Sequence, residues 1–353
     1  MSILDKKHRI YPYYKDGRFY NNCHEKKPAY ILPTLNMLVE WYFCRRHKKD
    51  INITSWIKKN DPIERSDDFA ITWIGHSSFL IQIGNMNILT DPIFGNLTPL
   101  FKRLAPPGID IEQLPNIDFI LISHNHPDHM DSYTLKSLKS NNKINNAKIL
   151  VPINDKKWFI SRGFNPDNVI ENTWWDRRNF FGHTKNSINY DDIEFIFLPA
   201  YHWSQRGIFD YNKSLWGSWM ISCKGLNIYF AGDTGYSGHF HSIQQEFDNI
   251  DIAIMPISPC EPHEWMKDSH VNAEEAGQGF IDLKAKHFIP MHWGTYFFGI
   301  DNFFLPYNRL TNWWQKQNFG DQKQLHVLKF GERYYVDSLV NKIPEKIYRE
   351  ISI

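Results

Sequence analysis

The sequence has few cysteines, almost no net charge and no long apolar run. Its four cysteines, Cys23, Cys44, Cys223 and Cys260, form no C-x-x-C pair. Neither a zinc ribbon nor a disulfide scaffold is indicated, and a reducing compartment fits. Forty Lys and Arg side chains nearly cancel thirty-nine Asp and Glu side chains, so no positive field draws the chain to nucleic acid. No window approaches the length of an uncharged membrane span.

The first twenty residues also lack the apolar run of a secretory signal. We therefore expect a cytoplasmic protein, or one that is peripheral on a membrane. Aromatic residues make up 16% of the chain, which is a high share. Such residues fill a core, line an apolar pocket or lie at a membrane interface.

The organisation of the chain changes near residue 69. Residues 1–68 are a polar, aromatic-rich lead-in, and residues 69–353 read as one large layered α/β domain. Within the lead-in, a helical spacing is followed by the basic run 45–49; the apolar positions are Leu35, Leu38, Val39 and Tyr42. We expect a helix packed on the domain, with an amphipathic membrane-surface helix as the alternative.

Short apolar segments separated by Gly and Asn turns predict a series of strands. The predicted strands lie within 69–75, 77–84, 86–91, 117–123, 148–152, 193–200, 215–223, 226–233, 250–258 and 285–293. Helices are predicted at 132–140, with Asp131 or Ser132 as the N-cap, and at 237–247, 272–283 and 306–315. Mixed strands with interspersed helices predict two sheets covered by helices.

Polar residues that can bind a metal follow four of the apolar strands. They are His124, His202, Asp233 and His292. Strands that each end in such a residue are expected to converge on one rim of the fold.

The segment "HNHPDH", residues 124–129, is the densest group of such side chains. In an extended loop His124 and His126 point the same way, whereas the adjacent Asp128 and His129 diverge, so one loop can serve two metal positions. Imidazole and carboxylate suit zinc or another borderline transition metal. A histidine-rich surface loop is the alternative, but the full H-x-H-x-D-H pattern directly after a buried strand favours the metal site.

At these residues the chain resembles the metallo-β-lactamase superfamily. Segments such as "TWIGHSSFLIQI", "LTDPIFG", "FAGDTGY" and "MHWGT" resemble, more specifically, the N-acylphosphatidylethanolamine-hydrolysing phospholipase D family. The resemblance implies a four-layer αββα sandwich with a dinuclear metal site at the sheet edges. It also suggests a homodimer and peripheral contact with a membrane that presents the phospholipid substrate. Pro127 departs from the family, whose mammalian member has a larger aromatic residue there.

The resemblance assigns the ligands of two zinc ions, with iron or manganese as the other metals of this ligand class. One ion would be held by His124, His126 and His202. The second ion would be held by Asp128, His129 and His292.

Three more carboxylate and imidazole roles follow from the resemblance. Asp233 would bridge the two metals. Asp91 would orient a ligand histidine, or else form only an Asp-Pro turn. His270 would lie near the reacting phosphate, or else act only at a helix entry.

The function implied is a phosphodiesterase of phospholipase D type. Metal ions would lower the pKa of a shared water, and the resulting hydroxide would attack phosphorus, with Asp128 accepting a proton or orienting the nucleophile. The products would be phosphatidic acid and an N-acylethanolamine. A lactonase or another soluble phosphoester hydrolase of the same fold is the main alternative, and a non-enzymatic metal- or lipid-binding protein is the other. Five tryptophans near the motifs fit an acyl-binding cavity or plain core packing: Trp203, Trp216, Trp219, Trp265 and Trp293.

Overall fold

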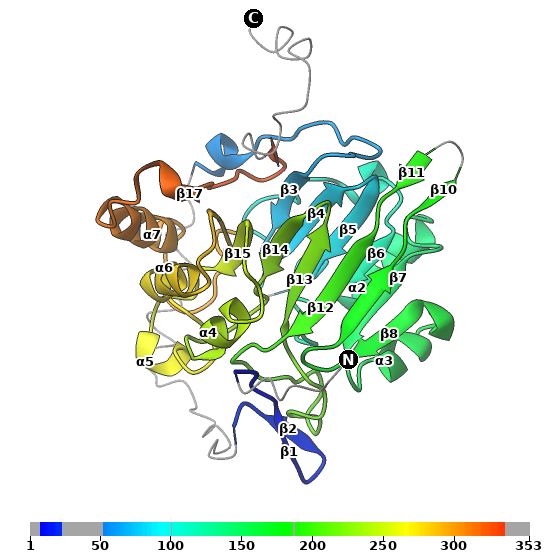
Figure 1. Cartoon of the computed structure of the whole chain (residues 1–353), viewed down its shortest axis with the longest axis horizontal. Coiled ribbons are helices and arrows are strands. Elements are labelled where there is room, and N and C mark those ends of the chain that lie inside the picture. Colours follow the sequence, from blue (N-terminus) through cyan, green and yellow to red (C-terminus); the bar gives the residue numbers. More distant parts are fainter. Residues whose placement is uncertain (1–7, 23–51, 100, 186–187, 336–353) are drawn as a thin grey trace, which may run out of the picture.

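The computed structural model describes residues 8–22, 52–99, 101–185 and 188–335. Its body consists of two mixed β-sheets packed face to face, with helices on the outer faces (Figure 1). This is the four-layer αββα arrangement predicted from the sequence. Each sheet has seven strands and changes from antiparallel to parallel pairing at its centre.

The first sheet has the order β18-β3-β4-β5-β6-β7-β8. Pairing is antiparallel from β18 to β5 and parallel from β5 to β8. Its strands are β3 (Ala70–Gly75), β4 (Ser78–Ile83), β5 (Met86–Thr90), β6 (Phe119–Leu121), β7 (Lys148–Pro152), β8 (Val169–Asn172) and β18 (Arg333–Tyr335).

The second sheet has the order β17-β16-β15-β14-β13-β12-β9. Pairing is antiparallel from β9 to β14 and parallel from β14 to β17. Its strands are β9 (Arg177–Phe180), β12 (Ile193–Leu198), β13 (Ser218–Cys223), β14 (Leu226–Phe230), β15 (Ile252–Pro256), β16 (His287–Met291) and β17 (Gln324–Leu325).

Helices and two small hairpins complete the described chain. The α-helices are α2 (Ser132–Ser140), α3 (Lys156–Ile160), α4 (His239–Gln244), α5 (His263–Met266), α6 (Ala273–Asp282) and α7 (Leu305–Gln315). The 3₁₀ turns are η2 (Ile53–Trp56), η3 (Ile111–Gln113), η4 (Pro166–Asn168) and η5 (Gly320–Gln322). The hairpin β1 (Tyr13–Lys15) with β2 (Arg18–Tyr20) lies at one end of the sandwich, and β10 (His183–Lys185) with β11 (Ile188–Tyr190) lies at the other (Figure 1).

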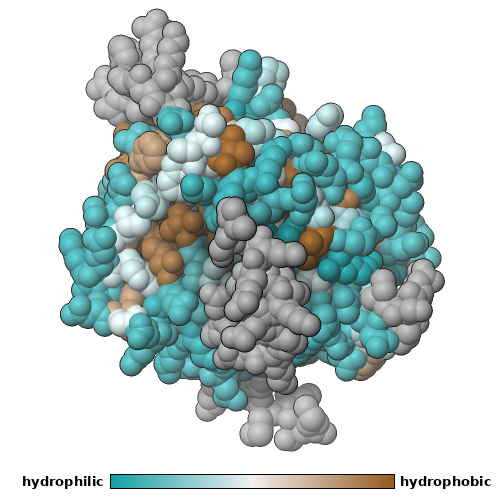
Figure 2. Space-filling model, turned by 90° about the horizontal axis from the view of Figure 1, so that it is seen from above, coloured by the Kyte–Doolittle hydropathy of each residue, from teal (hydrophilic) through white to brown (hydrophobic). Residues whose placement is uncertain are grey.

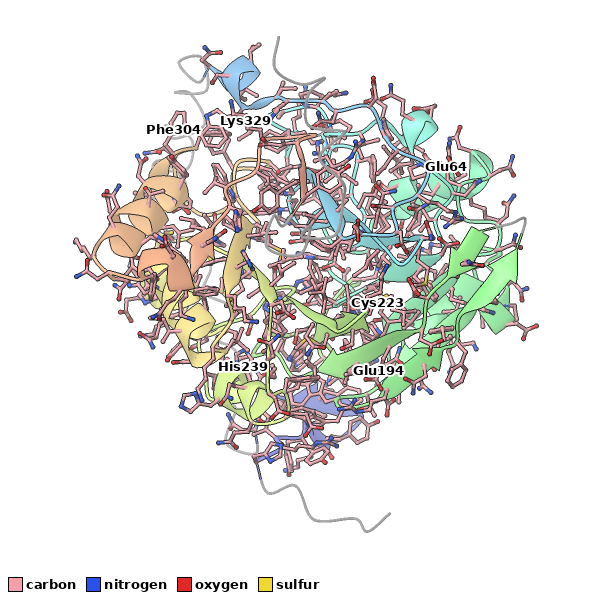
Figure 3. All side chains as sticks on the ribbon, turned by 45° about the horizontal axis from the view of Figure 1, so that its top comes forward. Glu64, Glu194, Cys223, His239, Phe304 and Lys329 are labelled. Carbon is pink, nitrogen blue, oxygen red and sulfur yellow. The ribbon has the colours of Figure 1, made fainter. Side chains whose placement is uncertain are left out.

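The alternation of side chains along the first sheet produces two apolar cores. Trp73, Phe79 and Leu121 belong to the larger core between the sheets, whereas their neighbours Ile74 and Leu80 belong to a smaller core under α2 and α3. Successive strand residues point to opposite faces, so a strand buried on both faces must be apolar throughout. Side chains fill the space between the layers (Figure 3). The face seen in Figure 2 is largely hydrophilic, with separate hydrophobic patches.

The structure confirms the predicted core strands and corrects their edges. Every strand predicted from an apolar run is present within its range, and Asp131 caps α2 by accepting hydrogen bonds from the backbone N–H groups of Tyr133 and Thr134. The sequence analysis missed the outer strands β8, β9, β17 and β18. They are short and partly exposed, so they lack the apolar run on which the prediction depends.

The described part of the lead-in contacts the core domain. Glu246, beyond α4, accepts hydrogen bonds from the side chain of Arg9 at 2.6 and 3.1 Å, and the backbone N–H of Phe19 donates to Asn212 O at 2.8 Å. The helix predicted around Leu35 to Tyr42 and the basic run 45–49 lie outside the described residues, as do Cys23 and Cys44. Within the described ranges, no helix combines the length and apolar character needed to cross a bilayer.

Candidate metal centre

The topology delivers the predicted ligands to a single rim of the sandwich. The segment 124–129 follows β6, and the strands β14 and β16 of the other sheet precede Asp233 and His292. Because β12 runs parallel in direction to β14, the loop after it brings His202 to the same rim. Carboxyl ends of parallel strands are where open α/β sheets place their functional groups. Each ligand therefore lies in a loop, while the strands behind it are apolar.

Three histidines form the first group. Nε2 of His124 lies 2.9 Å from Nδ1 of His126, and Nε2 of His202 lies 3.2 Å from the same Nδ1. All three side chains have potential ligand atoms within 4.8 Å of one another. The ring of Trp203 packs edge-on against His126, with 4.3 Å between the ring centroids.

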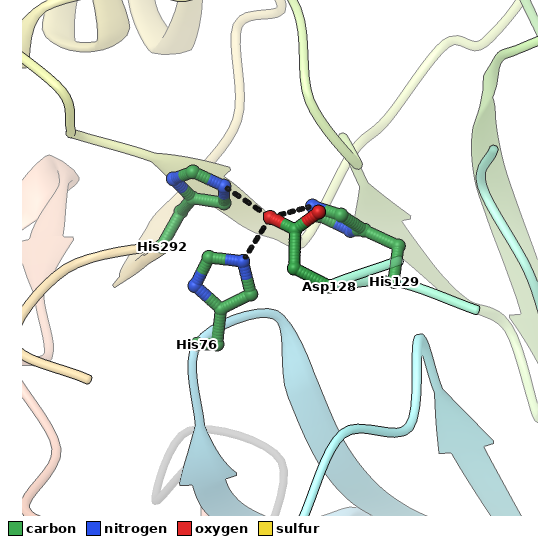
Figure 4. Close-up of side chains that lie close together, drawn as sticks. All are labelled: His76, Asp128, His129 and His292. Carbon is green, nitrogen blue, oxygen red and sulfur yellow. Dashed lines mark hydrogen bonds and ion pairs between the residues drawn. The ribbon is translucent and has the colours of Figure 1, made fainter. Parts of the chain in front are cut away.

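The second group surrounds the carboxylate of Asp128 (Figure 4). Its Oδ2 lies 3.5 Å from Nε2 of His129 and 3.9 Å from Nε2 of His292. A third histidine, His76, places its Nε2 3.0 Å from the same oxygen. These four side chains also satisfy the spacing of a metal site.

Asp233 lies between the two groups. Its Oδ2 is 3.1 Å from Nε2 of both His129 and His292, and 4.0 Å from Nε2 of His124. A carboxylate in this position faces histidines of both groups, as a bridging ligand must. The structure thus brings together all seven side chains that the sequence assigned to metal; their role as ligands stays a prediction.

Acceptors outside the centre fix how the imidazoles are protonated. Nδ1 of His129 donates to Asp91 Oδ2 at 2.8 Å, Nδ1 of His202 donates to the carbonyl of Ser269 at 2.8 Å, and Nδ1 of His292 donates to the carbonyl of Ser258 at 2.8 Å. In each ring the outer nitrogen is held by an acceptor outside the centre, so the inner Nε2 is the atom that faces the centre. Outer partners of this kind are what orient metal-binding histidines.

The outer nitrogen of His124 is also held by an acceptor, in this case a hydroxyl group. Ser123 Oγ donates to Asp91 Oδ2 at 2.6 Å, so it accepts from Nδ1 of His124, 2.9 Å away. Asp91 also accepts the backbone N–H of Ser123 at 2.7 Å. One buried aspartate therefore supports two of the histidines, beyond the single contact expected from the sequence.

Burial and the nearby carboxylates set the protonation of the centre. Burial lowers the pKa of His126 to about 4, and burial with the neighbouring rings holds the pKa of His124 and of His202 well below the usual range. Burial opposes the charge on Asp128, but His129 and His76 outweigh it and keep the pKa of that carboxyl well below its usual value. Burial opposes charge on His129, but Asp233 and Asp128 outweigh it and hold the pKa of His129 well above its usual value. Metal binding requires neutral imidazoles beside ionised carboxylates, so a bound ion would take the place of the proton on His129.

His76 is the one member of the centre that the sequence analysis did not assign. It directly follows β3, on the same rim as Asp91 after β5, and is 1% exposed. Its backbone carbonyl accepts the N–H of His292 at 3.1 Å, while its ring faces Asp128. Burial, with a contribution from His292, lowers its pKa to about 3. The signal was the position of "GHSSF" after a buried strand, the same rule that identified the other ligands.

The two predicted catalytic residues lie on the open side of the centre. The side chains of Asp128 and His270 are 14% and 17% exposed, whereas those of His129, His292 and Asp233 are at most 2% exposed. His270 Nδ1 lies 3.7 Å from Asp233 Oδ2. Burial lowers the pKa of His270 to about 4.

The five tryptophans named from the sequence differ in their surroundings. Trp216, Trp219 and Trp293 are buried core residues, which agrees with the packing alternative. Trp203 and Trp265 are partly buried.

The unsatisfied atoms of the centre fit bound cations. Nε2 of His129, Nε2 of His292 and Oδ1 of Asp233 are buried and have no hydrogen-bond partner among the described residues. Nε2 of His126 is likewise buried without a partner in the described part of the chain, while its Nδ1 faces the Nε2 atoms of His124 and His202. Buried polar atoms are normally paired, so a cation at these atoms would satisfy them. The donor set, imidazole and carboxylate, suits a divalent transition metal.

Comparisons with known proteins agree with this geometry. The model of the beta-lactamase superfamily domain matches residues 86–293. N-acyl-phosphatidylethanolamine-hydrolyzing phospholipase D 1 of Caenorhabditis elegans is 33% identical over 254 residues, covering 69% of each chain. The mitochondrial N-acyl-phosphatidylethanolamine-hydrolyzing phospholipase D of Saccharomyces cerevisiae is 35% identical over 247 residues, covering 68% of this chain and 50% of that protein.

Among solved structures, a metallo hydrolase from the archaeon Ignicoccus hospitalis matches with a TM-score of 0.53 at 20% identity, covering 76% of this chain and 98% of that chain. At that identity the likeness concerns the fold alone. The family match and the similarity to the worm protein go further. The chain belongs to the metallo-β-lactamase superfamily of hydrolases and, within it, to the family of N-acylphosphatidylethanolamine-hydrolysing phospholipase D proteins.

Proposed function

We propose that the protein is a dinuclear metal-dependent phosphodiesterase. It hydrolyses N-acylphosphatidylethanolamine-like phospholipids to phosphatidic acid and an N-acylethanolamine. The observation that carries the proposal is the convergence of His124, His126, His202, Asp128, His129, His292 and Asp233 on one rim, in two groups that share Asp233. The relatives named for this reaction supply the substrate class.

The proposed reaction breaks one phosphorus–oxygen bond. The oxygen of a water forms a bond to phosphorus, the bond to the ethanolamine oxygen breaks, and that oxygen leaves with a proton as the alcohol. Two divalent ions, for which zinc is proposed, would lower the pKa of the water and offset charge on the phosphoryl oxygens. Asp128, ionised and partly exposed, orients the water or accepts its proton. His270, on the open side, contacts a phosphoryl oxygen.

We further propose that the substrate is met at a membrane surface. The loop after His202 exposes two adjacent apolar side chains, Ile208 and Phe209, which are 82% and 81% exposed. Apolar side chains at a loop tip favour contact with lipid. Changing both to serine should lower sedimentation with phospholipid vesicles and leave turnover of a soluble phosphodiester unchanged. A homodimer also stays a proposal, which sedimentation velocity tests.

The test of the reaction is turnover of N-acylphosphatidylethanolamine in mixed micelles by the metal-loaded protein. We expect N-acylethanolamine to be released, to stop on chelation and to return when zinc is restored. Asp233→Asn should abolish it, whereas Asp251→Asn, a buried aspartate at the opposite end of β15, should retain it. Hydrolysis of a lactone with no turnover of bis-p-nitrophenyl phosphate would contradict the proposal and favour carbonyl chemistry.

A further inference from the structure

The loop that carries His202 also carries an arginine that reaches across to the segment 124–129. Arg206 lies four residues after His202, between β12 and β13. Its Nη1 donates to the carbonyl of Asn125 at 2.9 Å and to the carbonyl of Met130 at 2.6 Å. In the sequence these two carbonyls lie on either side of His126, Asp128 and His129, so one guanidinium spans the segment that supplies two members of the second group.

The partners of Arg206 are themselves held in place. Asn125 and Met130 are buried, and the Nδ2 of Asn125 donates to Asp155 Oδ1 at 3.0 Å. Nη2 of Arg206 donates to Ser132 Oγ at 3.2 Å. Its own backbone N–H donates to Asp210 Oδ1 at 3.2 Å, which fixes the start of the loop tip. The guanidinium therefore joins two ordered segments.

The other face of the guanidinium packs on Trp158 of α3. The Cζ of Arg206 lies 4.7 Å from the centroid of the ring. Arg162 stacks on the same ring at 4.0 Å, but among the described residues it donates only to Trp158 O and Ser161 Oγ, both outside the centre. The two arginines share one aromatic neighbour and differ in whether they contact the ligand segment, which makes Arg162 a matched control.

We propose that Arg206 is a positioning residue of the metal centre. It holds the segment 124–129 at a fixed position relative to the loop that supplies His202. Without it, His126 and His202, whose ligand atoms are 3.2 Å apart, lose a fixed relation between their backbones. The bridge needs several donors in one plane, which guanidinium has and ammonium lacks. The inference rests on the metal centre of the proposed function but not on its substrate.

The test measures metal affinity in the full-length protein. Arg206→Met, Arg206→Lys and Arg162→Met are titrated with zinc against a chromophoric chelator, and the absorption spectra of the cobalt forms are compared. We expect Arg206→Met to weaken zinc binding by about 10- to 100-fold, as loss of outer-shell partners does. The cobalt spectrum should change, Arg206→Lys should fall between, and Arg162→Met should match the parent.

The outcomes separate this inference from the proposed reaction. Unchanged zinc affinity and cobalt spectrum in Arg206→Met, or an equal loss in Arg162→Met, would overturn it. The melting temperatures of the metal-free variants show whether a loss comes from unfolding; if Arg206→Met fails to fold, Arg206→Lys decides in the same way. If the parent protein binds metal but releases no N-acylethanolamine, the proposed substrate is wrong. The role of Arg206 is then still decided by the zinc affinities of the variants.

Discussion

His129 and Asp91 form a fully buried pair in which Nδ1 of the imidazole lies 2.8 Å from Oδ2 of the carboxylate. The pair joins the loop after β5 to the segment after β6. It directs Nε2 of His129 toward Asp233, 3.1 Å away. A side chain that contacts no substrate thereby determines which nitrogen faces the centre.

Replacing Asp91 with asparagine should weaken metal binding. The two oxygens of the Asp91 carboxylate accept three hydrogen bonds, from His129 and from the N–H and Oγ of Ser123. An asparagine side chain has a single acceptor oxygen, so it cannot accept all three. We expect about a 10- to 100-fold loss of zinc affinity and a loss of about 1.5–3 kcal/mol in the free energy of unfolding. Asp118→Asn, at the opposite end of the same sheet, is the control. Equal zinc affinities in the two variants would argue against an orienting role.

Replacing His76 with alanine should impair the second group more than the first. The change removes the partner 3.0 Å from Asp128 Oδ2. A hydrogen bond to a charged group is worth about 1.5–3 kcal/mol, so kcat/KM should fall by about 10- to 100-fold. Zinc titration should show one equivalent weakened and the other retained. His326→Ala, at a partly buried histidine that pairs with His287 outside the centre, should keep both equivalents.

Metal removal should lower the melting temperature. The ligands come from both sheets, so bound ions tie the sheets together, and an ion that binds only the folded state stabilises it by about 4 kcal/mol at a thousand times its Kd. We expect differential scanning calorimetry to show a transition lower by several degrees after chelation. In Asp233→Asn the difference between metal-free and metal-loaded protein should shrink. A transition unaffected by chelation in the parent would contradict a metal site that spans the sheets.

Asp155 should make stability depend on pH. Burial raises its pKa to about 7, although the hydrogen bonds from Ser214 and Asn125 and the charge of Arg206 act in the other direction. Glu171 raises it further. Between pH 3.8 and about 7 the unfolded chain has lost this proton and the folded protein keeps it. The free energy of unfolding therefore falls as pH rises through this range, by about 1.4 kcal/mol for each unit of pKa difference.

Urea titrations of the parent and of Asp155→Asn test this dependence. Asparagine keeps an acceptor for Asn125 but cannot titrate. The variant should gain stability relative to the parent as pH rises from about 4 to about 7. Parallel curves for the two proteins would show that Asp155 does not hold its proton in the folded state.

The sequence was sufficient for features that depend on local pattern. Buried strands such as Ile252–Pro256 are apolar throughout, and the positions of Asp233 and His292 after such strands predicted one rim. The position of His76 after a buried strand was the same signal as for His292, but it was not applied there because no other candidate ligand lies beside it. Arg206 was missed because its partners are backbone carbonyls, which no side-chain motif records. Outer strands such as Arg177–Phe180 were not predicted, because their pairing depends on the neighbouring strand rather than on their own composition.

The polar chemistry of the molecule lies in loops beyond the strand ends, and the segment between Leu198 and Ser218 is one such loop. It contributes His202, the guanidinium of Arg206 and the exposed tip at Ile208 and Phe209, while the strands on either side pair with each other along their whole length. The part of this loop before the buried Leu215 and Trp216 can thus be exchanged as a unit with that of a relative while the paired strands stay in place. Such chimeras would transfer a metal ligand, its support and a surface contact in one graft, and would reveal which relatives share compatible partners on the opposite sheet.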